Sequence, residues 1–253
     1  MTIIISPAKK LTPTNNSLGV ETTRSEFPDK LNELIDYAKS LSEKDLIDKM
    51  KISSSLAQLN FDRFQKFQNR PSSNATTQAI YTFKGDTYVG LKAETFTQDD
   101  LLFAQQNLLI ISGLYGVLKP LDGIQPYRFE MGTKIDFNGY KSLYEFWMDP
   151  LFEFIKKRIE KNKNGILNLA SEEYSKVLNF NKLGCKLVTP TFKTEKNGEL
   201  KTVGMLSKRA RGMMANYVIK NKIKEYAKVN EFSEDGYAYC KKLSTPSRPV
   251  FIK

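Results

Sequence analysis

Three short apolar runs, each bounded by polar or turn-forming residues, set the strongest limit on how this 253-residue chain can fold. They are Ile3–Ile5, which ends at Ser6 and Pro7, the segment 107–112 (NLLIIS), and Ile166–Ala170. A short apolar run between turn signals is typical of a buried strand. The segment 107–112 predicts a strand that is covered on both faces. We therefore expect short buried strands at these three places.

Helical patterns lie between the strands. Apolar residues at three- and four-residue intervals predict a helix over Pro28–Leu41. Ser42 with Asp45 forms a capping box that opens a second helix, and Thr97 with Asp100 forms another. Phenylalanines every third residue between positions 60 and 67 predict one more helix, and we interpret them as core rather than as a platform for stacked bases.

The C-terminal part of the chain also mixes both kinds of element. It predicts a helix over 141–163, strands over 184–192 and 201–206 joined by an Asn197-Gly198 hairpin turn, and a long last helix over 207–229. We find no internal repeat and no low-complexity linker. The expected fold class is therefore α+β (mixed α/β), with residues 1–253 forming one compact single domain.

Positive charge is concentrated in the second half of the chain. The sequence has 39 Lys and Arg against 28 Asp and Glu, a formal net charge of +11. Residues 1–130 hold 15 of each kind, whereas residues 131–253 hold 24 basic and 13 acidic residues. So uneven a distribution gives the folded protein a positive side, and nucleic acid is the commonest polyanion that a soluble cell protein meets. We expect residues 131–253 to face the partner.

The composition excludes several kinds of site and location. The chain has no histidine, so a Ser-His-Asp triad, a Cys-His pair and His-ligated zinc are not available. Cys185 and Cys240 do not form a CxxC pair, and we expect both to be buried and inert. A tight iron site would have to be mainly carboxylate, and we expect no metal and no cofactor. No segment reaches the ~18 apolar residues of a membrane helix, so we expect a cytosolic (cytoplasmic) protein without membrane contact.

The densest basic motif is Lys208-Arg209-Ala210-Arg211-Gly212, at the start of the last predicted helix. Lys208 and Arg211 are three residues apart and share a helix face. A helix start offers cations and free backbone N–H groups to a phosphate together. Eight further lysines add to this half of the chain: Lys176, Lys182, Lys186, Lys193, Lys196, Lys220, Lys222 and Lys224. We interpret the motif as a phosphate-binding face rather than as an ordinary solvated surface.

Three other segments carry candidate site residues. The segment Ser112–Gly116 follows a predicted strand, and its two glycines either turn N–H groups toward a phosphate or serve a tight turn. The segments 125–132 (QPYRFEMG) and 168–176 (NLASEEYSK) each place a tyrosine beside a cation, and the second follows a predicted strand, where loops gather function. For these two segments, a structural tyrosine hydrogen bond and an ion pair of Arg128 with Glu130 or Glu173 are explanations as good as a functional site.

Six blocks spread along the chain form its most specific pattern. They are Ile5-Ser-Pro-Ala-Lys9, Ala79-Ile-x-x-Phe-Lys-Gly-Asp86 with Tyr88-x-Gly-Leu91, Ser112-Gly-Leu-Tyr-Gly-Val-Leu-Lys-Pro-Leu-Asp122, Pro126-Tyr-Arg128 with Glu130-Met-Gly132, Asn168-Leu-Ala-Ser-Glu-Glu-Tyr174 and Lys208-Arg-Ala-Arg-Gly212. Together, and in this order, they resemble the signature blocks of the YaaA family of peroxide-stress proteins. The resemblance spans nearly the full chain, from Ile4 to about Tyr239.

The resemblance implies a compact mixed α/β fold with a positively charged cleft and a helix-hairpin-helix-like element associated with DNA binding. It also implies a role in the response to hydrogen peroxide, in which the family limits free intracellular iron (iron homeostasis) and hence oxidative damage. Carried over to this chain, the hairpin would be Ser112–Gly116 with its flanks. The cleft cations would include Lys9, Arg128, Lys208 and Arg211.

Our leading hypothesis is a non-enzymatic protein of the oxidative-stress response that binds DNA, mainly without sequence preference, and affects iron indirectly. The residues expected to contact nucleic acid are Lys9, Ser112, Gly113, Tyr115, Gly116, Lys119, Arg128, Lys176, Lys193, Lys208 and Arg211. The rival hypothesis is an enzyme acting on a nucleotide or damaged base in the same cleft. Its candidate acid, base and anion-holding groups are Ser171, Glu173, Tyr174 and Lys176. A third alternative is a binder of RNA or of polyanions in general.

Overall fold

A five-stranded sheet lies at the centre of the molecule in the computed structural model, which describes residues 1–14, 18–72, 75–162 and 164–253. The strand order is β11-β10-β1-β5-β6. The strands are β1 (Thr2–Ile5), β5 (Leu108–Ser112), β6 (Gly116–Leu118), β10 (Ile166–Asn168) and β11 (Leu187–Val188). All are parallel except β6, which pairs with β5 in the antiparallel sense. The three apolar runs of the sequence thus form strands, as predicted, although β10 ends at Asn168, and the structure shows that the three are neighbours in the order β10, β1, β5.

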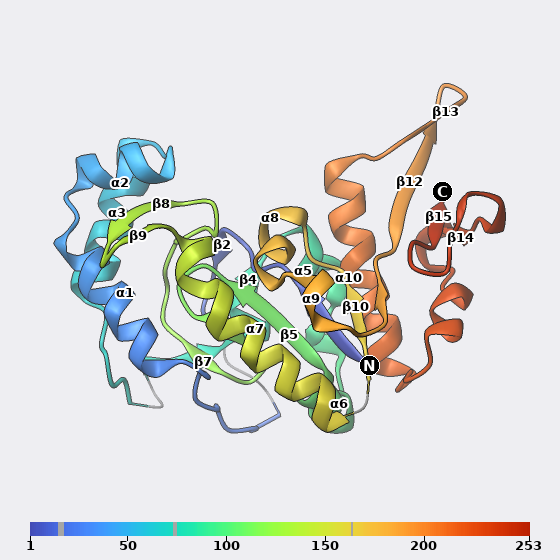
Figure 1. The fold of residues 1–253 in the computed structure, drawn as a ribbon, viewed down its shortest axis with the longest axis horizontal. Helices are drawn as coiled ribbons and strands as arrows, with labels where there is room; N and C mark the ends of the chain where they lie inside the picture. The colour runs from blue at the N-terminus through green and yellow to red at the C-terminus, as the bar shows by residue number, and fades with distance from the viewer. Residues whose placement is uncertain (15–17, 73–74, 163) are drawn as a thin grey trace.

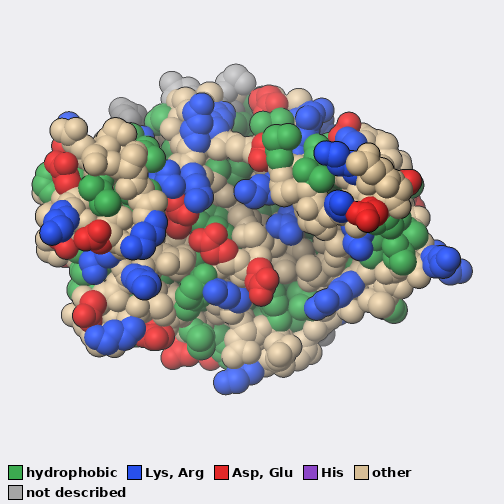
Figure 2. Space-filling view, turned by 90° about the horizontal axis from the view of Figure 1, so that it is seen from above, with side chains coloured by type: hydrophobic (Ala, Val, Ile, Leu, Met, Phe, Trp, Pro, Cys, Tyr) green, Lys and Arg blue, Asp and Glu red, His purple; other side chains and the backbone are tan. Residues whose placement is uncertain are grey.

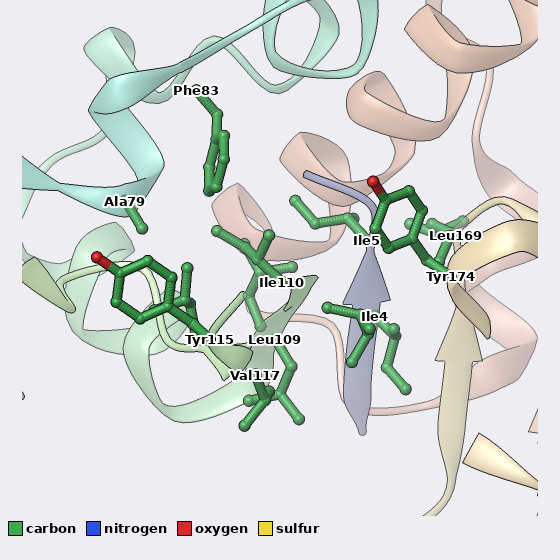
Figure 3. Packing of buried hydrophobic residues seen from close by; sticks show 14 of the residues in the cluster. Ile4, Ile5, Ala79, Phe83, Leu109, Ile110, Tyr115, Val117, Leu169 and Tyr174 are labelled. Carbon is green, nitrogen blue, oxygen red and sulfur yellow. The ribbon is translucent and has the colours of Figure 1, made fainter. Parts of the chain in front are cut away.

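Burial on both faces explains why these runs lack polar alternation. Every residue of β1, β5 and β10 is buried. Figure 3 shows how Ile4 and Ile5 of β1 and Ile110 of β5 meet side chains from other segments, among them Phe83 and Tyr174. Buried side chains from all parts of the chain join in one continuous core cluster.

Helices surround this sheet, and α7 crosses its near face in Figure 1. The α-helices are α1 (Pro28–Ser40), α2 (Glu43–Met50), α3 (Ser54–Gln65), α4 (Ala79–Thr82), α5 (Asp86–Leu91), α6 (Gln98–Asn107), α7 (Leu143–Asn162), α8 (Glu172–Ser175), α9 (Phe180–Leu183) and α10 (Gly204–Lys220). Short 3-10 helices cover Ala93–Thr95, Lys176–Leu178, Tyr226–Glu231, Glu234–Gly236 and Lys241–Leu243. The expected mixed α/β class is confirmed.

Both predicted capping boxes are present. At the start of α2, the Asp45 N–H donates to Ser42 Oγ at 3.2 Å, and the Ser42 N–H donates to Asp45 Oδ2 at 2.9 Å. At the start of α6, Thr97 and Asp100 exchange the same two bonds at 3.2 and 3.0 Å. These bonds satisfy N–H groups that the first turn of a helix leaves without partners. The phenylalanine stripe of α3 faces the core, as we interpreted it.

A second sheet and three small ladders complete the fold. The second sheet has the order β13-β12-β15-β14, with β12 (Thr191–Lys196), β13 (Glu199–Lys201), β14 (Ala238–Tyr239) and β15 (Val250–Ile252). The ladders pair β2 (Lys10–Leu11) with β4 (Phe83–Lys84), β3 (Thr77–Gln78) with β7 (Gly123–Ile124), and β8 (Lys134–Phe137) with β9 (Tyr140–Ser142). Asn197 and Gly198 join β12 to β13 with φ angles of 55° and 75°, as a two-residue hairpin turn requires.

Two predictions for the C-terminal part are corrected. The predicted strand over 201–206 is the end of β13 followed by the first turn of α10, because the apolar residues from 206 onward recur at helical intervals. The predicted helix over 207–229 ends at Lys220. Lys222 has a φ of 51°, a left-handed conformation that an α-helix cannot continue, and the chain then enters a 3-10 helix.

Helices α5 and α10 cross with their backbones in contact. Gly212 of α10 lies against the carbonyl oxygen of Thr87, and Gly90 of α5 lies against the carbonyl oxygen of Arg209. A Cβ atom at either glycine would overlap the facing carbonyl, so only glycine permits this approach. The contact fixes α10 relative to α5, and α10 also contacts β1.

Candidate phosphate-binding site at the carboxyl edge of the sheet

The carboxyl ends of β1 and β10 meet at one edge of the central sheet, because the two strands are adjacent and parallel. From β1 the chain goes to β5 on one side, whereas from β10 it goes to β11 on the other. In open α/β sheets, ligands bind where neighbouring strands lead away in opposite directions. The residues gathered here follow β1 (6–9) and β10 (169–176). We call them, with Arg128, Glu130 and Arg211, the carboxyl-edge site.

Hydrogen bonds tie the two loops together. The Ser171 N–H donates to Ser6 Oγ at 2.8 Å, and Ser6 Oγ donates to Ser171 Oγ at 3.2 Å. The hydroxyl of Tyr88, from α5, donates to the Ser6 carbonyl at 3.2 Å. Burial, with a smaller effect of the Glu173 carboxylate, raises the pKa of the Tyr174 hydroxyl. The edge is therefore a fixed arrangement of neutral hydroxyl groups, with the two serines half-buried.

Glu130 lies between two cations of this site. Lys9 Nζ is 2.7 Å from Glu130 Oε2, and Arg128 Nη2 is 2.7 Å from Glu130 Oε1. The Lys9 side chain is 64% exposed, whereas that of Arg128 is 15% exposed. One carboxylate thus balances two positive charges. The ion pair between Arg128 and Glu130, one of the two partners considered from the sequence, is the one that forms.

Glu173 and Lys176 brace the loop after β10 against α7 and its neighbours. Glu173 Oε1 accepts a hydrogen bond from the Gly132 N–H at 3.3 Å. The hydroxyl of Tyr144, on α7, donates to the Glu173 carbonyl at 2.9 Å. The Lys176 ammonium lies 4.1 Å from the centre of the Tyr144 ring, within the range of a cation–π contact. Glu173 therefore has a structural partner, and Lys176 remains exposed.

Helix α10 brings its first half to the same edge. It contacts β1, and Lys224, just beyond its end, lies near Met1, whose amino group has a pKa lowered by burial and by the charge of Lys224. The helix is therefore antiparallel to β1. From Arg211 to its C-terminal end α10 rises about 14 Å, close to the ~13 Å length of β1. The first half of α10, which contains Arg211, therefore lies toward the carboxyl end of the strand.

Arg211 is half-buried, and no acidic residue in the described ranges forms a salt bridge with it. It shares a helix face with Ser207, Met214 and Val218, which are all buried, so its side chain points toward the interior rather than to open solvent. Burial lowers the pKa of its guanidinium group. A cation that has lost part of its hydration without gaining a counter-ion is stabilised when an anion binds.

Further cations surround the site. Lys10 of β2 and Lys84 of β4 are directly opposite in an antiparallel ladder, an arrangement in which like charges repel. Lys208 is exposed one turn before Arg211. Figure 2 shows the face that lies at the top of Figure 1, where α8 and β2 are found. Lys and Arg side chains are spread around a hollow near its middle, with some Asp and Glu among them.

The hairpin predicted to contact a phosphate follows β5, which is parallel to β1, so it is at the same edge of the sheet, but it is buried and outside the carboxyl-edge site. Ser112, Gly113, Tyr115 and Gly116 are all buried, and the segment joins the strands β5 and β6 rather than two helices. Ser112 Oγ is 2.6 Å from the Tyr127 hydroxyl, and Gly116 lies against the ring of Trp147. Of the two roles considered from the sequence, the packing of these glycines favours a tight turn against the core, and a phosphate contact by this hairpin stays a prediction.

Two predicted cations are also outside the carboxyl-edge site. Lys119 follows β6 toward the other end of the sheet and pairs with Glu26 at 3.5 Å. Lys193 belongs to β12 of the second sheet. Conversely, sequence reasoning missed Tyr88 and the hydroxyl of Ser6. The position of Ser6 directly after an apolar strand was the available signal.

Other features bear on cofactors and cysteine chemistry. Within the described ranges, no group of three His, Cys, Asp or Glu side chains is arranged to hold a metal ion. Cys185 and Cys240 are free and half-buried, so the expectation of full burial is corrected. Burial raises the pKa of the Cys185 thiol. Among the helices that the structure describes, none has the length and apolar character needed to cross a bilayer.

Comparison with known proteins agrees with the resemblance drawn from the sequence. Residues 1–243 match the family model described as peroxide stress protein YaaA. A UPF0246 protein of Legionella pneumophila (strain Lens) is 41% identical over 256 residues, covering 100% of this chain and 99% of the relative. UPF0246 proteins of Teredinibacter turnerae and Shewanella sediminis are 42% and 40% identical, covering 100% and 99% of this chain and 99% and 98% of their own lengths. The chain therefore belongs to the family of the peroxide stress protein YaaA, also called UPF0246.

Proposed function

We propose that this member of a peroxide-stress family is a cytosolic protein that binds DNA, mainly without sequence preference, and that the carboxyl-edge site holds backbone phosphates. The observation that carries the proposal is Arg211. Its guanidinium group is half-buried and has no salt-bridge partner among the described residues. It belongs to the half of α10 that lies toward the carboxyl end of β1, where the hydroxyls of Ser6 and Ser171 meet. A phosphate oxygen would accept hydrogen bonds from the guanidinium and from a serine hydroxyl at once.

The balance of charge supports a polyanion as the partner. In the described part of residues 131–253, the cations that form salt bridges are Lys141, Lys201, Lys222 and Lys253. Most of the 24 basic residues in this half are thus not neutralised by a carboxylate. Exposed cations in such number attract a sugar–phosphate chain without reading its bases.

Phosphate binding also suggests how the protein would limit iron-dependent damage. DNA carries a layer of condensed cations, and a protein that neutralises phosphates with Lys and Arg releases them. Iron ions held at the backbone would be released in the same way, so peroxide would react with them away from the DNA. This effect on iron is indirect and needs no iron site in the protein.

The rival function, an enzyme acting on a nucleotide or a damaged base, has weaker support. In the described structure, the Ser171 hydroxyl accepts a hydrogen bond from Ser6 Oγ and is not bonded to a base. Glu173 accepts a hydrogen bond from a backbone N–H. A nucleophile needs a base within hydrogen-bond reach, and this arrangement does not supply one. Incubation with oligonucleotides followed by mass spectrometry would reveal any product.

A salt titration tests the proposal. Binding of a labelled duplex is measured by fluorescence anisotropy at several salt concentrations, for the wild type, Arg211→Ala, Lys208→Ala and the control Lys242→Ala, which is exposed on a distant 3-10 helix. We expect a steep wild-type slope of log K against log salt, and a loss of about 0.9 in slope for each phosphate contact removed. Removing Arg211 relieves a half-buried unpaired charge, so the thermal stability of this variant should not fall.

Three outcomes would contradict the proposal. An affinity that barely changes with salt would exclude phosphate contacts as the main interaction. A control variant that loses as much slope as Arg211→Ala would show that the carboxyl-edge site is not special. Preferential capture of structured RNA in competition with duplex DNA, at one ionic strength, would exclude the DNA assignment.

A further inference from the structure

A second basic surface lies at the opposite edge of the central sheet. It is an open cleft of about 930 Å³ between the start of β1, the end of α6, the last turns of α7 and the segment after α10. In Figure 1 these elements meet at the bottom of the molecule, near the N-terminus and α6, whereas α8 and β2 lie toward the top. We call this surface the amino-edge groove.

Four cations line the amino-edge groove and one carboxylate faces them. The cations are Lys157, Arg158, Lys161 and Lys224, and the carboxylate is Glu26. Glu26 already lies 3.5 Å from the ammonium of Lys119. Within the described residues none of the four cations forms a salt bridge. The groove therefore has a net positive charge that the protein itself does not balance.

Arg158 is held in place within the groove. Its Nη2 donates a hydrogen bond to the carbonyl oxygen of Gln106. Its Nε is buried and has no partner in the described structure. Burial lowers the pKa of the guanidinium group, with a smaller opposing effect of Glu26. The protein thus orients this cation while leaving part of its hydrogen-bonding capacity unused, as at a site for an oxyanion.

The remaining lining suits a sugar–phosphate chain better than an enclosed small molecule. Side-chain amides of Gln106, Asn107 and Asn162 add neutral hydrogen-bonding groups between the cations. Such groups, with Lys and Arg, make most contacts to phosphates and sugars. The cleft is open and most of its lining residues are polar or charged, with Met1, Phe103 and Phe154 as the apolar ones, whereas small-molecule sites are enclosed and mostly apolar.

We infer that the amino-edge groove is a second contact surface for the backbone of duplex DNA, so that one molecule holds two DNA segments on opposite edges of its sheet. The inference rests on the proposed function, since it adds a second duplex to the first. The two surfaces are separated by the length of the strands and face in opposite directions. Because DNA is stiff over about 150 base pairs, a short straight duplex on one edge cannot reach the other.

A bridging assay tests this inference. A short duplex of about one helical turn is fixed to beads, the protein is added, and capture of a second, fluorescent duplex is measured. The groove variant combines Lys157→Gln, Lys161→Gln and Lys224→Gln, which change exposed residues and leave Arg158 in place. The matched control combines Lys196→Gln, Lys241→Gln and Lys242→Gln, which remove the same charge from exposed positions outside both surfaces.

The expected results separate the two proposals. The wild type and the control should capture the second duplex, and the groove variant should capture about tenfold less while its binding of one duplex weakens only about threefold. Equal capture by the groove variant and the wild type would overturn the inference. That result is also the one expected if two copies of the protein, each with one DNA surface, form the bridge. A wild type that binds one duplex but never a second would overturn the inference alone. A wild type that binds no duplex would overturn the proposed function itself.

Discussion

Replacement of Glu130 by glutamine tests how the carboxyl-edge site is balanced in the free protein. The Glu130 carboxylate lies 2.7 Å from Lys9 Nζ and 2.7 Å from Arg128 Nη2. It therefore occupies these cations in the absence of DNA and would repel an arriving phosphate. Glutamine keeps the size and the hydrogen-bonding oxygen of the side chain but removes its charge.

The magnitude of the effect follows from Coulomb's law. A phosphate about 6 Å from the carboxylate is repelled by roughly 1 kcal/mol at an effective dielectric constant between those of water and of a protein surface. Release of Lys9 and Arg128 adds a comparable amount, so binding should tighten by about 2 kcal/mol, or about thirtyfold, near physiological salt. The slope of log K against log salt should steepen by about one to two, because two cations become free to contact phosphates.

The same substitution has an opposite effect on stability. The Arg128 side chain is only 15% exposed and loses its carboxylate partner in the variant. We expect the free energy of unfolding in urea to fall by about 1–2 kcal/mol. Tighter binding by a less stable protein would show that Glu130 stabilises the free state and opposes the complex.

The control is Asp136→Asn, which removes the same charge and frees Lys141 on the hairpin of β8 and β9. Both variants are titrated with labelled duplex by anisotropy across the same salt series. If Glu130→Gln binds no more tightly than Asp136→Asn, the gain comes from net charge alone. If it binds more weakly than the wild type, Glu130 holds Arg128 in its binding position and does not compete with the phosphate.

Three further predictions concern the fold. Gly212→Ala should lower the free energy of unfolding by about 3 kcal/mol, because the new methyl group meets the Thr87 carbonyl; an unchanged urea midpoint would contradict the contact. Burial raises the pKa of the Asp122 carboxyl above its ordinary value. The protonated Asp122 carboxyl therefore stabilises the fold at pH below the ordinary carboxyl pKa, and this stability is lost as pH rises through the raised pKa. In urea unfolding measured across pH, Asp122→Asn should not show this loss of stability. Ser42→Ala removes the α2 cap and should cost about 1 kcal/mol by thermal unfolding.

Local signals in the sequence were sufficient for the central strands and for many helix starts. The segment 107–112 lacks polar alternation, and the structure shows why, since β5 is buried throughout. Ser42 and Thr97 each precede an aspartate by three residues, and both form the bonds that this spacing predicts. Such signals involve residues that are close in sequence, so the bonds they predict do not depend on how distant segments pack.

The site was harder to predict because it depends on contacts between distant segments. A glycine that allows a close approach to the backbone looks the same in the sequence whether its neighbour is a phosphate or an aromatic ring. In the structure, Gly116 lies against the ring of Trp147. Helical spacing predicts that Lys208 and Arg211 share a face, but it could not show that Arg211 is half-buried while Lys208 is exposed, in the half of α10 that lies toward the carboxyl end of β1. That placement follows from the antiparallel arrangement of α10 and β1, which no local pattern encodes.

The central sheet itself explains why two basic surfaces would form where they do. Its middle strands are buried along their whole length, so charged side chains have access only at the two ends of the strands, where loops begin. Cations that gathered on one face with a net charge of +11 would repel each other strongly. Placed at opposite edges, they are separated by the strands and their loops, about 15 Å or more. This exceeds the Debye length of ~8 Å at physiological ionic strength, so each surface can attract its own phosphate chain without weakening the other.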